Sequence, residues 1–456
     1  MEKYSMFPKL SEKYQNELIE NLKKFVAINS VYDESTVSEE NPFGEGVSKA
    51  LQFIEELAKK DGFKVTNYAN KIVEILIGEG DKNITIMAHA DVVPAGDTGW
   101  KQDPFTMTEK KGVLCGRGVA DDKGPLLAAY YGLRSLVDNH LLGDYQVRFL
   151  VGGNEESGSA GMIYYFEELK KPQPTYGFSP DAEYPLIFAE KGIVNFKVTD
   201  EFSVPEVISI HGGTASNSVI EKCIVRLKVG SPFAEYVTSK GYDVEISKTN
   251  KYVEIKFIGK SAHGSTPEEG INAGMIALEA LAFYYENKDL ERIVSLYKDL
   301  YGKGCNVYSE SKEMGKNSLN VGIIDYEENK LSMIINFRHV ESIKQDEVIN
   351  RFNEASKPSK VEVIAISPLL YYPKDSTLVA TLLTVYQEET GDYKTMPKAI
   401  GGGTYAKEAD NVVAFGMEFP GWNSMMHSPG ESTKKEDLFK SIAIYARAIY
   451  ELGKKL

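Results

Sequence analysis

The apolar residues of this chain alternate between strand-like and helix-like runs, and this alternation is interrupted in the middle of the chain and then resumes. Short β-branched runs at 72–77, 84–88 and 145–151 are separated by longer stretches with helical spacing, of which 125–137 is the clearest. Strands that alternate with helices of this length are typical of a sheet whose parallel strands are covered by helices. The pattern therefore predicts an α/β fold for the first part of the chain.

The middle of the chain follows a different pattern. After about residue 191 the strands come in neighbouring runs with alternating polar and apolar side chains, as at 223–229, 319–324 and 331–337. Together with a long helical stretch at 271–285, this indicates an α+β domain in which helices cover one face of a sheet. From about residue 375 the first pattern returns.

The chain length also favours two domains, because 456 residues exceed the size at which one hydrophobic core stops growing. We predict a first, catalytic domain formed by residues 1–190 and 375–456, with a mixed, mostly parallel sheet flanked by helices. Residues 191–374 are expected to form an inserted α+β lid domain.

Composition excludes several classes of protein. With 52 Lys and Arg against 66 Asp and Glu, the formal net charge is −14, and no segment has the dense basic clustering that tracks a nucleic acid. No segment approaches the roughly 18 consecutive apolar residues of a membrane span, and the N-terminus does not resemble a signal peptide. The three cysteines have no CxxC spacing, which fits a reducing compartment. We expect a cytoplasmic protein with neither nucleic acid nor membrane as a partner.

The first candidate motif, HADVVPAG, places His89 and Asp91 at the end of an apolar run. Residues at i and i+2 of a strand point to the same face, so an imidazole and a carboxylate can lie together at the carboxyl edge of a sheet, where open α/β folds keep their sites. A metal-binding histidine commonly donates its other ring N–H to such a carboxylate. The alternative is a structural histidine near a strand end.

Two further acidic motifs lie between strands and helices. In GRGVADDKGP, the alternative to a metal ligand is that Asp121 or its neighbour is simply a helix N-cap. Capping does not require the flanking glycines or the Lys-Gly that follows. GGNEESGSAG contains Glu155 and Glu156, whose side chains should point in different directions, so that one can bind a metal while the other faces a reacting water. A solvated acidic pair is the alternative.

SPDAEYP and SMMHSPGE contribute one more carboxylate and one more imidazole. Each motif is a weak signal alone, but together five candidate ligands lie at strand ends or loops of the first domain: His89, Asp121, Glu156, Asp181 and His427. Two imidazoles and three carboxylates suit zinc, manganese or cobalt, with one carboxylate shared by two metals roughly 3.5–4 Å apart. The sequence therefore predicts a dinuclear metal centre.

These motifs also carry a family resemblance. HADVVPAGDTGW, GRGVADDKGP, GGNEESGS, SPDAEYP and MHSPGE resemble, in this order, the metal-binding blocks of the co-catalytic zinc peptidases, a family that includes carboxypeptidase G, aminoacylase, acetylornithine deacetylase and carnosinase. Within it, DDKGPLLAAYYGL and AIGGGTYAKEADNVVAFGMEFPG are most similar to the dipeptidase V branch of bacterial, carnosinase-like Xaa-His dipeptidases. The likeness covers nearly the whole chain and implies a zinc-peptidase-like catalytic domain and a metal-dependent dipeptidase that acts on small unblocked peptides.

The resemblance implies two divalent metal ions, with zinc as the first expectation and manganese or cobalt as alternatives. His89 and Asp181 would hold one ion, Glu156 and His427 the other, and Asp121 would bridge them, with the peptide bond from Asp121 to Asp122 in the cis form. Two more residues have implied roles. Asp91 would orient His89, and Glu155 would be the general base that activates a metal-bridging water and passes its proton to the leaving amine.

Residues of the lid domain have implied roles in substrate binding. His263, in GKSAHGSTPEEGINA, would stabilise the oxyanion. Asn217 and Arg338 match positions that bind the terminal carboxylate of a dipeptide, and a planar guanidinium suits a carboxylate because it can pair with both oxygens. The alternative for Arg338 is a surface ion pair. The backbone of Gly402, Gly403 and Thr404, in the glycine-rich turn that begins at Gly401, would line the same pocket.

The resemblance also implies a monomer, because relatives with long lids of the dipeptidase V kind supply the counterpart of His263 within one chain. In this branch a different sequence usually follows the last histidine, whereas here it reads SPGE. This leaves the ligand His427 intact but affects the expected wall of the substrate-specificity pocket.

Two other functions compete with the dipeptidase. An N-acyl amino acid deacylase of the acetylornithine or succinyl-diaminopimelate type would use the same metals and the same Glu155. A catalytically inactive relative used for binding would be expected to lack ligands, and here all five ligands, Asp91 and Glu155 are present.

Overall fold

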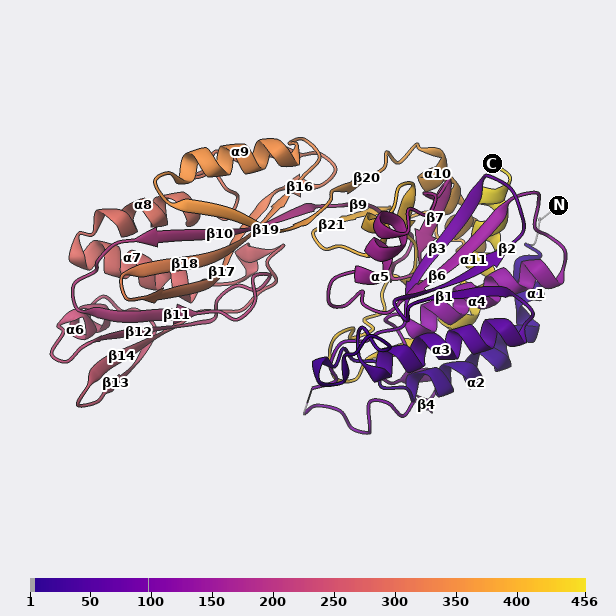
Figure 1. The fold of residues 1–456 in the computed structure, drawn as a ribbon, viewed down its shortest axis with the longest axis horizontal. Helices are drawn as coiled ribbons and strands as arrows, with labels where there is room; N and C mark the ends of the chain where they lie inside the picture. The colour runs from indigo at the N-terminus through magenta and orange to yellow at the C-terminus, as the bar shows by residue number, and fades with distance from the viewer. Residues whose placement is uncertain (1–4, 97) are drawn as a thin grey trace. The chain divides into compact units, whose positions relative to one another are not determined.

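The computed structural model describes residues 5–96 and 98–456, and the chain divides into two compact units (Figure 1). Unit 1 contains residues Met1–Ala189, Tyr372–Lys398 and Gly403–Leu456, and unit 2 contains Glu190–Tyr371 and Ala399–Gly402. None of the described helices is long and apolar enough to cross a membrane.

Unit 1 is built on a mixed sheet with the strand order β1-β2-β6-β3-β7-β22-β9. Its central strands pair in parallel: β6 (Gln146–Gly152), β3 (Asn83–His89), β7 (Tyr176–Ser179) and β22 (Val412–Ala414). Towards the edges the pairing is antiparallel, with β1 (Lys64–Tyr68) and β2 (Ile72–Ile77) on one side and β9 (Ile187–Glu190) on the other. The mixed α/β fold is confirmed, with the parallel pairing confined to the centre of the sheet.

Helices cover this sheet because their apolar faces match its buried strands. The long helices are α2 (Gln15–Val26), α3 (Glu45–Lys60), α4 (Lys123–Asp138), α10 (Thr377–Thr390) and α11 (Lys435–Gly453). α3 packs on β1, β2 and β6, while α4 and α11 pack on each other and on β3 (Figure 1). Every residue of β3 is consequently buried. A central strand buried in this way holds its last residue, His89, in a fixed position.

Unit 2 contains an eight-stranded sheet in the order β13-β14-β12-β11-β17-β18-β10-β19, with every neighbouring pair antiparallel. Its three longest strands are neighbours: β17 (Ser318–Glu327), β18 (Lys330–His339) and β10 (Gly192–Glu201). The other strands are β11 (Val207–Gly212), β12 (Lys222–Lys228), β14 (Tyr252–Ile258) and the two edge strands, β13 (Val244–Lys248) and β19 (Lys360–Ser367).

One face of this second sheet is covered by helices. α7 (Ala273–Tyr285) packs on β11, β12, β14 and β17, α8 (Lys288–Tyr297) packs on α7, and α9 (Gln345–Ser356) packs on β10 and β19 (Figure 1). Alternate apolar residues of the strands enter this core, for example Val194, Phe196 and Val198 of β10. The residues between them, such as Asn195 and Lys197, lie on the opposite face of the strand.

The chain passes between the two units at Ala189/Glu190 and at Tyr371/Tyr372. A short segment, Ala399–Gly402, differs from the rest of residues 375–456, which the sequence assigns to the catalytic domain, because it belongs to unit 2. Tertiary contacts cause this difference, because the backbone N–H of Lys191 donates to the carbonyl of Ile400 and Ser265 contacts Gly401 so closely that no Cβ would fit.

Candidate metal centre and substrate-binding residues

The candidate ligands of unit 1 gather where its parallel strands end. His89, the last residue of β3, is in register with Gly152, the last residue of β6. Glu155 and Glu156 follow β6, and Asp181 follows β7. Because parallel strands have their carboxyl ends at the same edge, residues far apart in sequence meet there.

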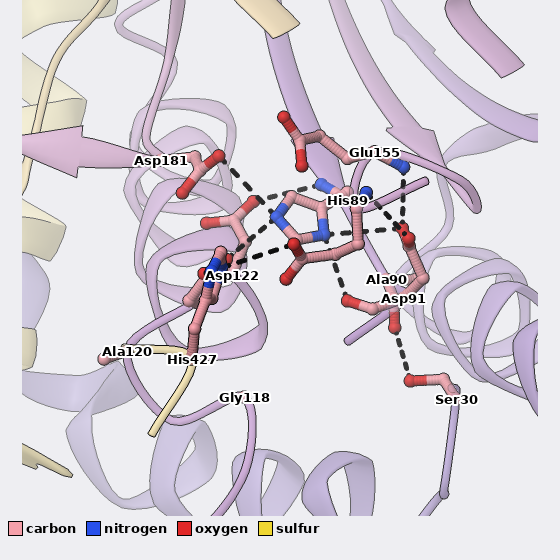
Figure 2. A network of polar contacts seen from close by, with 12 residues as sticks. Ser30, His89, Ala90, Asp91, Gly118, Ala120, Asp122, Glu155, Asp181 and His427 are labelled. Carbon is pink, nitrogen blue, oxygen red and sulfur yellow. Dashed lines mark hydrogen bonds and ion pairs between the residues drawn. The ribbon is translucent and has the colours of Figure 1, made fainter. Parts of the chain in front are cut away.

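His89 lies at the centre of this cluster, with Asp91 on one side and Asp181 on the other (Figure 2). The ring is fully buried. Its Nε2 lies 3.0 Å from Oδ1 of Asp121 and 3.6 Å from Oδ2 of Asp181, while its Nδ1 lies 3.0 Å from the backbone oxygen of Asp91 and 3.4 Å from its Oδ1. Burial alone would lower the pKa of His89, but hydrogen bonds with these three acids raise the pKa well above its usual value.

Asp121 presents its two carboxylate oxygens to two different imidazoles. Oδ1 faces His89, and Oδ2 lies 2.8 Å from Nε2 of His427, which is also 3.3 Å from Oε2 of Glu156. Burial opposes ionisation of Asp121, but the hydrogen bonds from His427 and His89 outweigh it and lower the pKa of Asp121. The peptide bond from Asp121 to Asp122 is cis, as the resemblance implied.

Helix capping does not explain the acidic pair. Asp122 occupies the N-cap position of α4, but its side chain makes no capping hydrogen bond. Its Oδ2 instead accepts the backbone N–H of His89 at 3.0 Å. This contact ties the loop before α4 to the end of β3.

Asp91 holds the loop that carries both glutamates. Its Oδ1 accepts the backbone N–H of Glu155 and its Oδ2 accepts that of Glu156, each at 3.1 Å (Figure 2). The expected contact with Nδ1 of His89 is present at a longer distance. Asp91 therefore connects β3 to the loop after β6, a second role that the sequence did not indicate.

The carboxylates of this cluster are crowded and buried. Burial raises the pKa of Glu155 well above its usual value, and the neighbouring charges of Asp181 and Glu156 raise it further. Burial and Asp121 raise the pKa of Glu156 to about 7. Oε1 of Glu156 is buried and has no hydrogen-bond partner among the residues that the structure describes. A concentration of negative charge with an unpaired oxygen is the environment that a bound cation would stabilise.

The donor set fits divalent metal ions. Across residues 5–96 and 98–456, two groups of three side chains have ligand atoms within 4.8 Å of one another: His89, Asp121 and Glu156 in one, and His89, Glu155 and Asp181 in the other. Glu155 and Glu156 thus belong to different groups. His427 joins the first group through its contacts with Asp121 and Glu156.

A buried ion pair below the cluster was not anticipated. Nη1 of Arg117 donates to Oε2 of Glu431 at 2.7 Å, and Oε1 of Glu431 accepts backbone N–H groups of Gly118, Ala120 and Asp121 at 2.9–3.2 Å. Glu431 comes four residues after His427, in the unusual SPGE run, and Arg117 belongs to the GRG string that capping left unexplained. In the sequence, the signals that could have indicated this ion pair were the string GRG-x-x-DDKG and an acidic residue four positions after the last histidine.

In unit 2, Arg338 is only 3% exposed, which excludes the surface ion pair considered as its alternative. Its Nε donates to Oδ1 of Asn336 at 2.8 Å, and its Nη1 donates to the carbonyl of Gly401. Among the described residues, no carboxylate lies within ion-pair distance of this guanidinium. A guanidinium has five N–H donors, and those without an acceptor in the protein can donate to an anion.

The predicted oxyanion residue and Asn217 lie on adjoining loops of unit 2. Ser218 pairs with His263 in an isolated antiparallel bridge, and the N–H of Gly264 donates to the carbonyl of Asn217 at 2.7 Å. Nδ1 of His263 lies 2.6 Å from Oγ of Ser265. Burial and the charge of Arg338 lower the pKa of His263, which favours the neutral imidazole.

The glycine-rich turn divides between the units. Gly402 belongs to unit 2, while Gly403 and Thr404 belong to unit 1. The side-chain oxygen of Thr404 accepts the N–H of Ala406 at the start of a 3-10 helix, Tyr405–Glu408. Asp97, which lies in the first motif, is outside the described residues.

Comparisons with known proteins agree with the fold. Residues 85–451 match the model of peptidase family M20/M25/M40. A Staphylococcus aureus (strain USA300) protein with a provisional dipeptidase name is 32% identical over 469 residues, covering 98% of this chain and 99% of the relative.

Solved structures show the same fold at low sequence identity. Human carnosine dipeptidase 1 is 16% identical with a TM-score of 0.59, covering 99% of both chains. The di-peptidase Dug1p of Saccharomyces cerevisiae is 16% identical with a TM-score of 0.59, covering 98% of both chains. From the family match and the full-length relative, this chain belongs to peptidase family M20/M25/M40 and is a hydrolase of peptide bonds.

Proposed function

We propose that this peptidase is a metal-dependent dipeptidase that hydrolyses unblocked dipeptides, with Xaa-His and carnosine-like peptides as first candidates. The observation that carries the proposal is the carboxylate of Asp121, whose two oxygens face two different imidazoles. A carboxylate shared by two cations needs this arrangement. The dipeptidase names of the relatives point to the same reaction.

His89 and Asp181 would hold one divalent ion and Glu156 and His427 the other, with Asp121 between them. When bound, such ions polarise the scissile carbonyl and make an attacking water more acidic. Zinc is the first candidate, and manganese and cobalt tolerate the same ligands. The identity of the metal is part of the proposal.

Glu155 would act as the general base. Its buried carboxylate has a raised pKa, so it can take a proton from the attacking water and give it to the leaving amine. Asp91 fixes the backbone of Glu155 and the orientation of His89, so that both stay in place through the reaction.

Arg338 and Asn217 would bind the terminal carboxylate of the dipeptide, and His263 would donate to the oxyanion through Nε2. The backbone N–H of Ser265 donates to Nδ1 of His263, which leaves the proton of the neutral ring on Nε2. Gly402, Gly403 and Thr404 would contact the substrate through their backbone.

The N-acyl amino acid deacylase is less favoured, because the relatives carry dipeptidase names. Metal-stripped protein reconstituted separately with zinc and manganese should hydrolyse free dipeptides, including β-alanyl-histidine, faster than their N-acetyl forms. A preference for the N-acetyl forms would make the enzyme a deacylase.

The role of Glu155 has its own test. Glu155→Gln should lower kcat by roughly 10²–10⁴-fold while metal content, measured by plasma mass spectrometry, stays near that of the wild type. Glu168→Gln is the matched control, because Glu168 is exposed. Full activity of Glu155→Gln would exclude Glu155 as the base.

A further inference from the structure

Arg338 is the end of a chain of side-chain hydrogen bonds on the face of the second sheet opposite its helices. Asn336 and Arg338 are two residues apart on β18, so their side chains share a face. Across the sheet, Asn336 is in register with Asn195 of β10 on one side and with Asn320 of β17 on the other. Three asparagines therefore form a row beside the guanidinium.

The hydrogen bonds of this row have a fixed direction. Arginine can only donate, so Asn336 must turn its oxygen to Nε of Arg338, at 2.8 Å. Its amide nitrogen then faces away and donates to Oδ1 of Asn195, also at 2.8 Å. Asn195 thereby fixes the orientation of the Asn336 amide, and Asn336 fixes Nε of Arg338.

The remaining contacts leave one end of the guanidinium available. Nη1 donates to the carbonyl of Gly401, and Nη2 has no acceptor among the residues that the structure describes. Arg338 is 3% exposed and Asn336 is 2% exposed, so bulk water has little access to replace a partner that either side chain loses. The direction in which Nη2 points therefore depends on the hydrogen bond from Nε of Arg338 to Asn336.

The same row is joined to the loop of Asn217. Nδ2 of Asn320 donates to the carbonyls of Ser216 and Ser218, each at 2.9 Å, on both sides of Asn217. The two residues proposed to bind the terminal carboxylate are thus held by paired asparagines on neighbouring strands, Asn336 of β18 and Asn320 of β17.

We propose that Asn336 and Asn195 are positioning residues that aim the guanidinium of Arg338 at the terminal carboxylate of the dipeptide; this inference rests on the proposed role of Arg338. They do not contact the reacting atoms. They hold the guanidinium of Arg338 in one orientation before the substrate binds. This favours a dipeptide with a free terminal carboxylate over one whose C-terminus is uncharged.

The readout is the ratio of kcat/KM for a free dipeptide to that for its C-terminal amide, measured on one preparation of the metal-loaded enzyme. The ratio cancels the fraction of active protein, so a partly unfolded variant is still informative. Asn336→Leu, which keeps the shape but removes the acceptor, should lower the ratio roughly tenfold. Asn195→Leu should lower it less, because Asn336 keeps its contact with Arg338.

Ser332→Leu is the matched control, since Ser332 lies on the same strand and face but outside the chain of bonds, and it should leave the ratio unchanged. In the Arg338→Ala background, Asn336→Leu should have no further effect. An unchanged ratio in Asn336→Leu, or an undiminished effect of Asn336→Leu in the Arg338→Ala background, would overturn the positioning role. If Arg338→Ala itself leaves the ratio unchanged, Arg338 does not bind the carboxylate and the proposed function of that residue fails instead.

Discussion

Glu431 is not a candidate ligand, but its hydrogen bonds hold the loop that carries the candidate ligand Asp121. One of its oxygens binds three backbone N–H groups of the loop that ends in Asp121, and the other pairs with buried Arg117. A side chain that orients the backbone of a ligand affects metal affinity without touching the metal.

Glu431→Gln should therefore weaken metal binding by roughly 10–100-fold, because it perturbs the loop that positions Asp121. It should also lower the free energy of unfolding by about 3 kcal/mol, because it leaves the guanidinium of Arg117 buried without a counter-charge. Metal titration and urea unfolding measure the two effects. Glu436→Gln, at an exposed position in the first turn of α11, should change neither. Unaltered metal affinity in Glu431→Gln would limit that residue to a structural role.

At the scale of elements, the start of α4 is pressed against the loop that carries Asp121. A Cβ on Gly124 would lie 2.1 Å from the carbonyl oxygen of Val119, which no rearrangement of a side chain can relieve. The glycine of the DDKG string is thus required by close approach of helix and loop.

Gly124→Ala should displace this loop and reduce metal affinity at least tenfold, even though alanine favours helices more than glycine does. Isothermal titration with zinc checks the affinity, and circular dichroism checks that α4 remains folded. Wild-type affinity in the variant would mean that the loop can move without affecting Asp121.

The second sheet depends on the docking of α9. Phe352 of α9 stacks on Phe196 of β10 with ring centroids 3.9 Å apart, and both are fully buried. Phe352→Ala should lower the free energy of unfolding of unit 2 by about 3–5 kcal/mol. Arg351→Ala, at the exposed neighbouring position, is the control. A loss below 1 kcal/mol in urea unfolding would mean that α9 contributes little.

At the scale of the whole molecule, the candidate ligands all belong to unit 1, so metal binding should stabilise that unit alone. Adding metal at about 1,000 times its Kd should stabilise unit 1 by roughly 4 kcal/mol. Calorimetry of stripped and reloaded protein should show one unfolding transition that moves and one that does not, and Phe352→Ala should identify the unmoved transition as unit 2. A shift of both transitions by the same amount would contradict this assignment. Removal of metal should also abolish hydrolysis.

The monomeric state stays a prediction that mass measurement can check. Size-exclusion chromatography with light scattering should give a mass near 50.7 kDa across a range of concentrations. A species of twice that mass would contradict the expectation that one chain supplies all of its own residues.

Sequence patterns were sufficient to predict the class of fold, the family and the side chains that cluster. His89, Glu156 and Asp181 could be found because His89 ends a strand and the other two lie in loops that follow strands, and the carboxyl ends of parallel strands meet at one edge. Their roles as ligands, and those of Glu155 and His263, remain predictions.

The contacts that support these side chains became apparent only in the folded chain. Arg117 and Glu431 are 314 residues apart in sequence, Asn336 and Asn195 are 141 apart, and Ala399–Gly402 joins the unit opposite to its neighbours in sequence. Periodicity and motifs report the surroundings of a residue within one strand or turn. The partner of a buried charge or amide depends instead on which distant segments pair, and local sequence does not carry that information.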